Sequence, residues 1–377
     1  MTSHRSVLLL TPGPLTTSAA TKSAMLRDWG SRDPDFIALT AAIRRRLVDI
    51  AGVTRTHVAV PLQGSGTFAI EATLGTLTPP AAKVLVLANG AYGRRMTLIL
   101  QRIGRQPVMV ENAEDTPNDI DALADTLAGD PTISHVAAVH CETTSGILNP
   151  MEAIAAITRE HGRRLIIDAM SSFGALPIDP ADGEAFDALV ASSSKCLEGV
   201  PGLAFAVVRE DALSGSAGHA PSLALDLHDQ WRGFERDGQW RFTPPTHVVA
   251  AFAAALDEHA TEGGVIGRGR RYRENCRVLV REMRSLGFET FLPDALQAPI
   301  IVTFRIPGDG RFEFGAFYTR LSERGFVIYP GKLTEVDSFR VGCIGRLAAS
   351  DMVAACEAIA AVCAEMGVVT LAPARGG

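Results

Sequence analysis

Three features of this sequence have side chains that could bind one small molecule and react with it. Lys195 follows three serines in DALVASSSKCLEGVPG, Asp168 ends the apolar run RRLIID, and the turn GSGT at residues 64–67 precedes an apolar helical stretch. The chain has only four lysines, because arginine supplies most of its 36 basic residues. A lysine just past a predicted buried strand therefore suggests a need for a primary amine, which arginine cannot supply.

The GSGT turn is a candidate site for an anionic group. It leads into a helix N-terminus, whose free N–H groups and dipole attract phosphate, and the hydroxyls of Ser65 and Thr67 can donate as well. The segment GSGTFA also fits a dinucleotide-binding pattern, but the next strand ends in Asn89 where that pattern needs an acidic residue. A tight turn capped by Ser65 and Thr67 is the structural alternative.

Asp168 and Lys195 also have structural interpretations, as a helix cap before SSFGA and as a lysine that extends from a strand end to solvent. A buried carboxylate is costly without a partner, however, and the small polar context of Lys195 suits a pocket. Together, the lysine, the carboxylate and the turn match the needs of pyridoxal phosphate. The lysine would form a Schiff base, the carboxylate would keep the pyridine nitrogen protonated, and the turn would hold the phosphate.

The elements that must position these residues alternate between strand and helix signals. Short apolar runs predict strands at 57–62, 83–90, 134–140, 163–169 and 186–192. Between the third and fourth of them we expect a helix with Asn149 at its N-cap and Pro150 at N1. Such alternation predicts an α/β fold with a mostly parallel sheet, whose ligands bind beyond the carboxyl ends of the strands. The turn, Thr143, Asp168 and Lys195 all lie at such ends.

The chain is long enough for two domains. We expect a large cofactor-binding domain at residues 15–257 and a smaller α+β domain formed by residues 1–14 plus 258–377. The small domain begins near the pair Gly263-Gly264 with an arginine-rich helix and continues with three strand signals. In its last helix, Cys356 and Cys363 fall on one apolar face and are interpreted as core residues.

Composition excludes several classes of protein. Of 377 residues, 47% are hydrophobic and 21% charged, and the net charge of −6 comes without a basic block, so nucleic-acid binding is not expected. No apolar run approaches the length of a membrane span. The six cysteines form no CxxC pair, so we expect neither a metal site nor disulfides, and a reduced cytoplasmic setting fits best.

Several segments together resemble one known family. The chain resembles class V aminotransferases of PLP fold type I over about residues 9–346. The segments that carry the resemblance are TPGPLTT, QGSGTFAIEA, ANGAYGRR, HCETTSGILNP, IIDAMSSFGA, SSSKCLEGVPG, FTPPTHVV and FRVGCIG. Within this class, the chain is most similar to the 2-aminoethylphosphonate–pyruvate aminotransferases. Four segments together carry this similarity: DWGSRDPDF, CETTSGILNP, SSSKCLEGVPG and GFVIYPGKLT. The resemblance implies transfer of the amino group of 2-aminoethylphosphonate to pyruvate, giving phosphonoacetaldehyde and alanine in phosphonate degradation.

The resemblance also implies roles for individual residues. Lys195 would carry the internal aldimine, Asp168 would pair with the pyridine nitrogen, and Ser65, Gly66 and Thr67 would form the phosphate cup. Further cofactor contacts are implied for Tyr92 (stacking on the ring), Thr143 (near the phenolic oxygen), Ser193 (phosphate) and Thr243. Thr243 would reach the phosphate of the neighbouring subunit's cofactor, which implies a homodimer. For Tyr92, a core aromatic is the structural alternative.

Arg340 is the implied binder of the substrate's anionic group. A planar fork of donors suits both a carboxylate and a phosphonate, so one arginine could serve both substrates of a ping-pong transaminase. A salt bridge at a strand edge is its structural alternative.

Alternative functions remain open at this point. Within the class, a serine– or alanine–glyoxylate aminotransferase is the nearest rival. A desulfurase would need a cysteine nucleophile, but neither Cys196 nor Cys343 lies in the long loop that such chemistry uses. From other classes, an NAD-dependent oxidoreductase could use GSGTFA, and a non-catalytic PLP-fold protein would be expected to lack Lys195 or Asp168.

Overall fold

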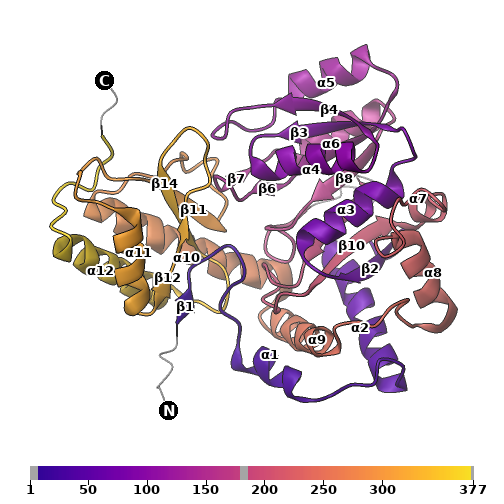
Figure 1. Cartoon of the computed structure of the whole chain (residues 1–377), viewed down its shortest axis with the longest axis horizontal. Coiled ribbons are helices and arrows are strands. Elements are labelled where there is room, and N and C mark those ends of the chain that lie inside the picture. The colour runs from indigo at the N-terminus through magenta and orange to yellow at the C-terminus, as the bar shows by residue number, and fades with distance from the viewer. Residues whose placement is uncertain (1–6, 179–185, 375–377) are drawn as a thin grey trace.

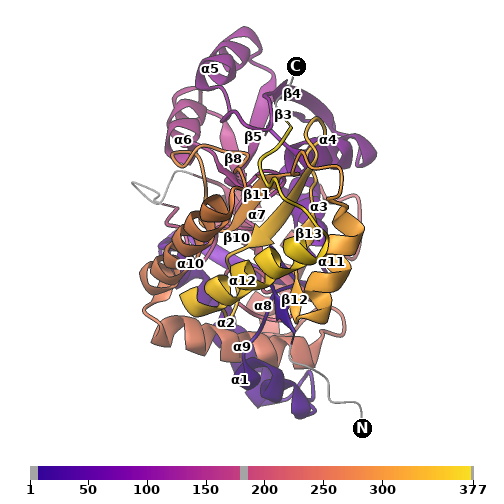
Figure 2. The ribbon, with the colours of Figure 1, turned by 90° about the vertical axis from the view of Figure 1, so that its left-hand side faces the viewer.

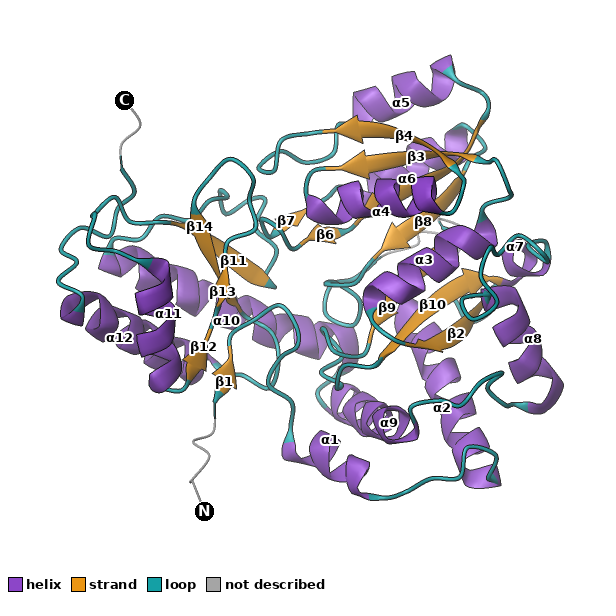
Figure 3. Ribbon diagram, viewed as in Figure 1, coloured by secondary structure: helices purple, strands orange, loops and turns teal. Residues whose placement is uncertain are grey.

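A seven-stranded sheet forms the centre of the larger lobe in this computed structural model, which describes residues 7–178 and 186–374 (Figures 1 and 3). Its strands, in spatial order, are β2 (His57–Gln63), β10 (Leu203–Arg209), β9 (Ala188–Ser192), β8 (Arg164–Asp168), β5 (Ile133–Val139), β3 (Lys83–Ala88) and β4 (Gln106–Glu111). From β9 to β4 all neighbours are parallel, whereas β10 is antiparallel to both β9 and β2. The expected mostly parallel α/β sheet is therefore confirmed.

The antiparallel strand β10 and the edge strand β4 were not among the predicted strands. Because β10 lies between β2 and β9 and runs opposite to both, β2 points the same way as β9. The turn after β2 therefore lies at the same edge of the sheet as Asp168, at the end of β8, and Lys195, just after β9.

Side chains that alternate along each strand bury both faces of this sheet. In β3, Leu85 and Leu87 pack into one core, while Val84 and Val86 pack into the other. The first core is covered by α2 (Pro34–Ala51), α5 (Ile120–Gly129), α6 (Met151–Glu160) and α9 (Thr246–Thr261). The second is covered by α3 (Gly66–Leu77), α4 (Ala91–Arg102) and α8 (Leu227–Asp237), with the short α7 (Glu210–Ser214) beside them.

The smaller lobe has its own sheet and core, and Figure 2 shows it facing the viewer. Its three-stranded sheet orders β11 (Ile301–Arg305), β14 (Ser338–Gly342) and β13 (Tyr329–Pro330), packed with α10 (Gly264–Leu286), α11 (Phe314–Glu323) and α12 (Ala349–Glu365). Cys356 and Cys363 lie in this core. The amino-terminal strand β1 (Leu8–Leu9) pairs with β12 (Phe326–Val327). The first chain segment is thereby attached to the carboxyl-terminal lobe.

Three short elements complete the connections between the lobes. The small hairpin of β6 (Cys141–Glu142) and β7 (Ile147–Leu148) follows β5, and α1 (Ala19–Ser23) with a 3-10 turn (Ala24–Leu26) leads from β1 toward α2. Among the described residues, no helix combines the length and apolar character needed to cross a bilayer.

The helix start expected at Asn149 is wrong by one residue, and the reason is informative. Pro150 takes the N-cap position of α6, and the Asn149 side chain is buried in a network instead. Its amide donates to Val139 O at 2.9 Å and to Asn89 Oδ1 at 3.2 Å, while its oxygen accepts from Asn89 Nδ2 and the Asn118 backbone. The side chain therefore joins the carboxyl ends of β3 and β5 rather than capping a helix.

Candidate active site

One cavity of about 490 Å³ lies at the carboxyl ends of the central strands and collects most of the predicted site residues. The arrowheads of β3 and β4 in Figure 3 point from the large sheet toward the smaller lobe. Of the predicted residues, its walls include Ser65, Gly66, Thr67, Tyr92, Thr143, Asp168 and Lys195. The predicted amine and carboxylate thus face a single space, together with the predicted phosphate-binding turn.

The phosphate-binding turn has an available hydroxyl and an unobstructed helix N-terminus. Ser65 is the N-cap residue of α3, yet its side chain makes no capping hydrogen bond. Gly64 has φ +120°, a conformation that favours glycine. A Cβ on Gly66 would lie 2.4 Å from the Met170 sulfur, so only glycine fits there without displacing Met170. Phe68 N donates to Ser65 O, and the backbone N–H groups of Gly66 and Thr67 at the start of α3 are therefore the ones open to an anionic ligand.

Arg95 adds a positive charge to this turn and was missed in the sequence analysis. It lies in α4, lines the cavity, and donates from Nη1 to Thr67 Oγ1 at 3.2 Å. Its guanidinium also lies over the Tyr92 ring, 4.8 Å from the centroid. Its position three residues after Tyr92 places the two side chains on the same side of α4.

Lys195 is held at the cavity wall by its surroundings. Its Nζ donates to Pro12 O at 2.6 Å. Gly13 has φ +117°, and a Cβ there would lie 2.8 Å from the Lys195 Cδ, so this glycine makes room for the side chain. Burial lowers the pKa of Lys195, because a charged amine loses its hydration there. A larger fraction of the amine is therefore neutral and nucleophilic.

A buried ion network fixes the turn that follows Lys195. Glu198 has φ 57° and accepts hydrogen bonds from Arg271 Nη2 at 2.7 Å and from the Tyr272 hydroxyl at 2.6 Å. Arg268, which is fully buried, donates to Cys196 O at 2.6 Å and pairs with Glu262. These arginines belong to α10, so the smaller lobe orients the lysine turn of the larger one.

Asp168 fits both interpretations that the sequence allowed, a cap of the following turn and a carboxylate that faces the candidate cofactor site. Its Oδ1 accepts the Met170 backbone N–H at 2.9 Å, which caps the following turn. None of the described residues gives a hydrogen bond to Oδ2. Burial raises the pKa of Asp168 to about 6, because the ionised carboxylate is poorly solvated. The second oxygen is therefore an acceptor without a protein donor on the cavity side.

Tyr92, Thr143 and Arg340 lie together at the other end of the site. Arg340 does not line the cavity itself, but its Nη1 donates to Thr143 O at 2.8 Å and its Nε to Pro330 O at 3.0 Å. Burial opposes ionisation of Tyr92, yet the charge of Lys195, a hydrogen bond with Thr143 and the charge of Lys332 together lower its pKa. Positive charge thus surrounds the Tyr92 ring.

Besides Arg340, two predicted cofactor contacts, Ser193 and Thr243, do not line this cavity. The Ser193 hydroxyl donates to Val200 O at 2.6 Å and to Leu203 O at 3.0 Å, and its predicted contact with the cofactor phosphate stays a prediction. Its neighbours Ser192 and Ser194 line the cavity instead. Thr243 is exposed outside the cavity, so its predicted role in a neighbouring subunit stays a prediction.

The cysteines do not have the properties of nucleophiles. Cys196 and Cys343 are fully buried. Burial raises the pKa of Cys196 to about 12, and a hydrogen bond with Cys276 together with burial raises that of Cys343 well above its ordinary value. Their thiolates are therefore disfavoured.

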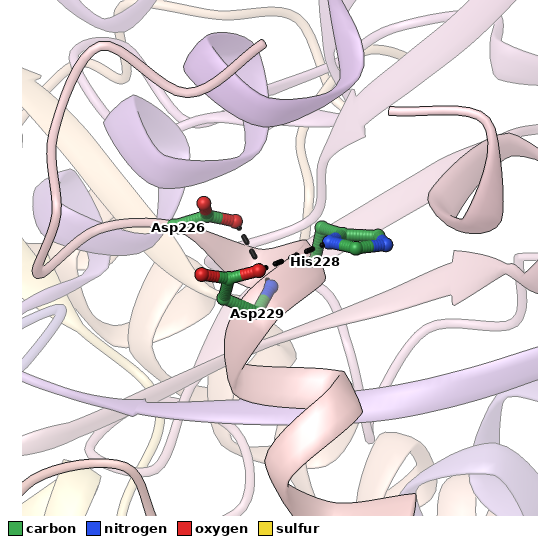
Figure 4. Close-up of side chains that lie close together, drawn as sticks. All are labelled: Asp226, His228 and Asp229. Carbon is green, nitrogen blue, oxygen red and sulfur yellow. Dashed lines mark hydrogen bonds and ion pairs between the residues drawn. The ribbon is translucent and has the colours of Figure 1, made fainter. Parts of the chain in front are cut away.

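A cluster of Asp226, His228 and Asp229 at the start of α8 has the composition of a metal site (Figure 4). Its contacts are those of a helix start, because Asp226 Oδ1 accepts the Asp229 backbone N–H at 3.0 Å and His228 Nδ1 lies 3.2 Å from Asp229 Oδ1. Arg241 pairs with the other oxygen of Asp229 at 3.3 Å. We therefore interpret the cluster as a cap.

Comparisons with known proteins agree with this geometry. Residues 18–331 match the family described as aminotransferase class-V. The 2-aminoethylphosphonate–pyruvate transaminase of Pseudomonas aeruginosa strain PAO1 is 54% identical over 370 residues, which cover 98% of this chain and 100% of that one. Among solved structures, pyridoxamine–pyruvate aminotransferase from Mesorhizobium loti has 26% identity and a TM-score of 0.88, covering 97% and 94% of the two chains. Alanine–glyoxylate aminotransferase from Nostoc sp. has 25% identity, a TM-score of 0.88 and 95% coverage of both.

Proposed function

The chain belongs to the class-V aminotransferase family, and from this premise we propose that it moves the amino group of 2-aminoethylphosphonate to pyruvate. The products are phosphonoacetaldehyde and alanine. The observation that carries the proposal is the shared cavity of Lys195, Asp168 and the GSGT turn, in a chain 54% identical over nearly its whole length to a transaminase of that name.

Pyridoxal phosphate is the cofactor, and the residues present fit it. The open N-terminus of α3, the free Ser65 hydroxyl and Arg95 suit the phosphate, and the unpaired Oδ2 of Asp168 suits a protonated ring nitrogen. When bound, the cofactor supplies an aldehyde that combines with amines and a ring that delocalises the electrons left when a substrate C–H bond breaks.

The residues of the chain then perform the remaining tasks. Lys195 would hold the cofactor covalently, and its freed amine would take the proton from the amine-bearing carbon of the substrate and pass it to the cofactor carbon that carried the aldehyde. Burial, which favours the neutral amine, suits this role as a base. Asp168 would keep the ring nitrogen protonated, Tyr92 would pack on the ring, and Thr143 would contact its phenolic oxygen. Arg340 binds the anionic end of either substrate.

The same proposal includes the assembly and location of the enzyme. We assign residues 15–257 to the cofactor-binding domain and residues 1–14 plus 258–377 to the small domain; residues 1–6, 179–185 and 375–377 lie outside the described structure. A cytoplasmic homodimer is proposed, in which Thr243 reaches the partner's phosphate. Exposed apolar side chains support an interface there, since Phe68 and Phe242 line one small cavity of about 110 Å³ and are about half exposed.

The absorbance spectrum of the purified enzyme tests the proposed reaction. The visible band of the bound cofactor is expected to bleach with 2-aminoethylphosphonate and to return with pyruvate. Serine and alanine serve as rival donors, and glyoxylate as the rival acceptor. If serine or alanine bleaches the band and 2-aminoethylphosphonate does not, the phosphonate assignment is wrong and the glyoxylate branch is favoured.

Lys195→Ala is the matching variant. It should bind the cofactor without covalent attachment, so borohydride should trap none of it, and turnover should fall by a factor of about 10⁴ or more, because both the attachment and the proton transfer are lost. A Lys195→Ala enzyme with normal turnover would falsify the mechanism.

A further inference from the structure

We propose that Lys332 is a second anion-binding residue, which acts with Arg340 to recognise the phosphonate group and to favour it over a carboxylate. This inference rests on the proposed function and specifies how the site selects its donor. It assigns a role to Lys332, whose ammonium group contacts Tyr92, a residue of the cavity wall.

The loop between β13 and β14 places Lys332 at the site. At its base, Gly331 N donates to Ser338 O at 2.9 Å. Farther along, Thr334 N donates to Glu114 Oε2 at 2.9 Å, which ties this loop of the smaller lobe to the larger one. Lys332 lies between these two attachments. Its Nζ lies 4.2 Å from the centroid of the Tyr92 ring, which forms part of the cavity wall.

The ammonium group of Lys332 has no anionic partner of its own. Within the described ranges 7–178 and 186–374, it makes no hydrogen bond or ion pair, and its contact is the aromatic face of Tyr92. The nearby carboxylate of Glu142 is buried and already occupied, because it accepts from the backbone of Tyr92 and from the backbone and hydroxyl of Thr144. A cation–π contact is weaker than a charge-assisted hydrogen bond, so a phosphonate oxygen would be a better partner.

Arg340 leaves room for this second cation. Two of its three nitrogens, Nε and Nη1, donate to the carbonyl oxygens of Pro330 and Thr143, whereas Nη2 makes no hydrogen bond to the described residues. The free fork expected from the sequence is thus partly engaged by the protein. Arg340 and Lys332 both lie near Tyr92. Lys332 contacts the Tyr92 ring, whereas Arg340 donates to the backbone oxygen of Thr143, whose side chain hydrogen-bonds with Tyr92.

The two substrates differ in the property that a second cation would detect. A phosphonate has three oxygens and a charge that approaches −2 near neutral pH, as phosphate monoesters do. The carboxylate of pyruvate has two oxygens and a single charge. One arginine nitrogen with its fixed position can serve the carboxylate, whereas the extra oxygen and charge of the phosphonate require another donor. Lys332 therefore adds affinity selectively for the donor substrate.

The test is calorimetric binding of two unreactive ligands to the holoenzyme: ethylphosphonate and propionate, which lack the amine. Lys332→Met is expected to raise the dissociation constant of ethylphosphonate about tenfold or more, the loss of one charge-assisted hydrogen bond, and that of propionate less than about threefold. Lys332→Arg should restore much of the ethylphosphonate affinity. Lys22→Met, an exposed lysine outside the site, is the matched control and should change neither constant.

Other outcomes overturn the inference. If Lys332→Met loses affinity equally for both ligands, Lys332 only supports Tyr92. If it loses affinity for neither, Lys332 does not bind substrate. If the wild-type enzyme binds propionate as tightly as ethylphosphonate, the proposed selectivity is refuted. Arg340→Lys, by contrast, should weaken the binding of both ligands. If Lys332 governs ethylphosphonate binding but 2-aminoethylphosphonate does not react, the proposed function fails and the binding inference stands.

Discussion

Asp168 shows how one buried side chain serves both the fold and the chemistry. Its first oxygen caps the turn after β8, and its second faces the cavity with no protein donor. In the protein without cofactor, such an unpaired carboxylate is costly to ionise, which is why burial raises its pKa to about 6. The site therefore carries a local cost that a protonated ring nitrogen can relieve.

This cost predicts a pH dependence for the cofactor-free protein. Between its ordinary pKa of 3.8 and the folded value of about 6, Asp168 binds a proton more tightly in the folded than in the unfolded chain. The free energy of unfolding therefore falls as the pH rises through that window, by about 3 kcal/mol. Asp168→Asn cannot ionise, so this variant should lack that fall.

Urea unfolding of both cofactor-free proteins at pH 4 and pH 7 measures the difference. Asp168→Asn should gain about 2 kcal/mol relative to the wild type on going from the lower to the higher pH, because at pH 4 the unfolded carboxyl is already partly ionised. A difference that does not change with pH would mean that Asp168 ionises freely in the folded protein. The same variant should bind the cofactor more weakly, because its neutral amide cannot balance the positive charge of a protonated ring nitrogen.

At the scale of elements, short polar connections hold the strand ends in register. Asn149 joins the end of β3, through Asn89, to the end of β5, through Val139, and also accepts the Asn118 backbone N–H. Thr143 follows β5, and Tyr92 follows β3, so this network fixes the distance between two walls of the cavity.

Asn149→Ala should therefore lower stability by about 2–4 kcal/mol, because it leaves several buried donors and acceptors without partners. Chemical denaturation measures the effect. Asn112→Ala is the matched control, since Asn112 makes a hydrogen bond near the surface, to the Asp119 backbone, and should cost well under 1 kcal/mol. Equal losses in the two variants would show that the buried network adds nothing beyond a surface contact.

At the scale of the whole molecule, the site is assembled by both lobes. The larger lobe supplies Lys195, Asp168 and the phosphate-binding turn, and the smaller lobe supplies Arg340, Lys332 and the α10 arginines that hold the lysine turn. Thr243 lies on the surface, so it completes the site only if a second copy of the chain is present.

Mixed dimers test whether Thr243 acts on the partner's cofactor. In a dimer of one Lys195→Ala chain and one Thr243→Ala chain, a role across the interface places both changes in one site and leaves the other site intact. Such dimers should keep about half of the wild-type activity with wild-type cofactor affinity. If Thr243 acts within its own subunit, the surviving site carries the Thr243→Ala defect, and its cofactor affinity should match that of the Thr243→Ala homodimer.

The sequence by itself determined the local features of this protein. Apolar runs identified most strands of the large sheet, and residue chemistry identified Lys195, Asp168 and the GSGT turn, because propensity, turn preferences and amine chemistry are properties of short segments. Their position at one edge of the sheet was also predictable, because alternating strands and helices form a mostly parallel sheet whose carboxyl strand ends lie together.

The tertiary structure decided what depends on pairing between distant segments. It inserted β10 between β2 and β9, turned the Ser193 hydroxyl toward backbone carbonyls, and used Asn149 in a network rather than as a cap. It also brought Arg95 to the phosphate-binding turn and Lys332 to Tyr92. No short-range pattern encodes these contacts, because each is set by the packing of side chains from elements far apart in the chain.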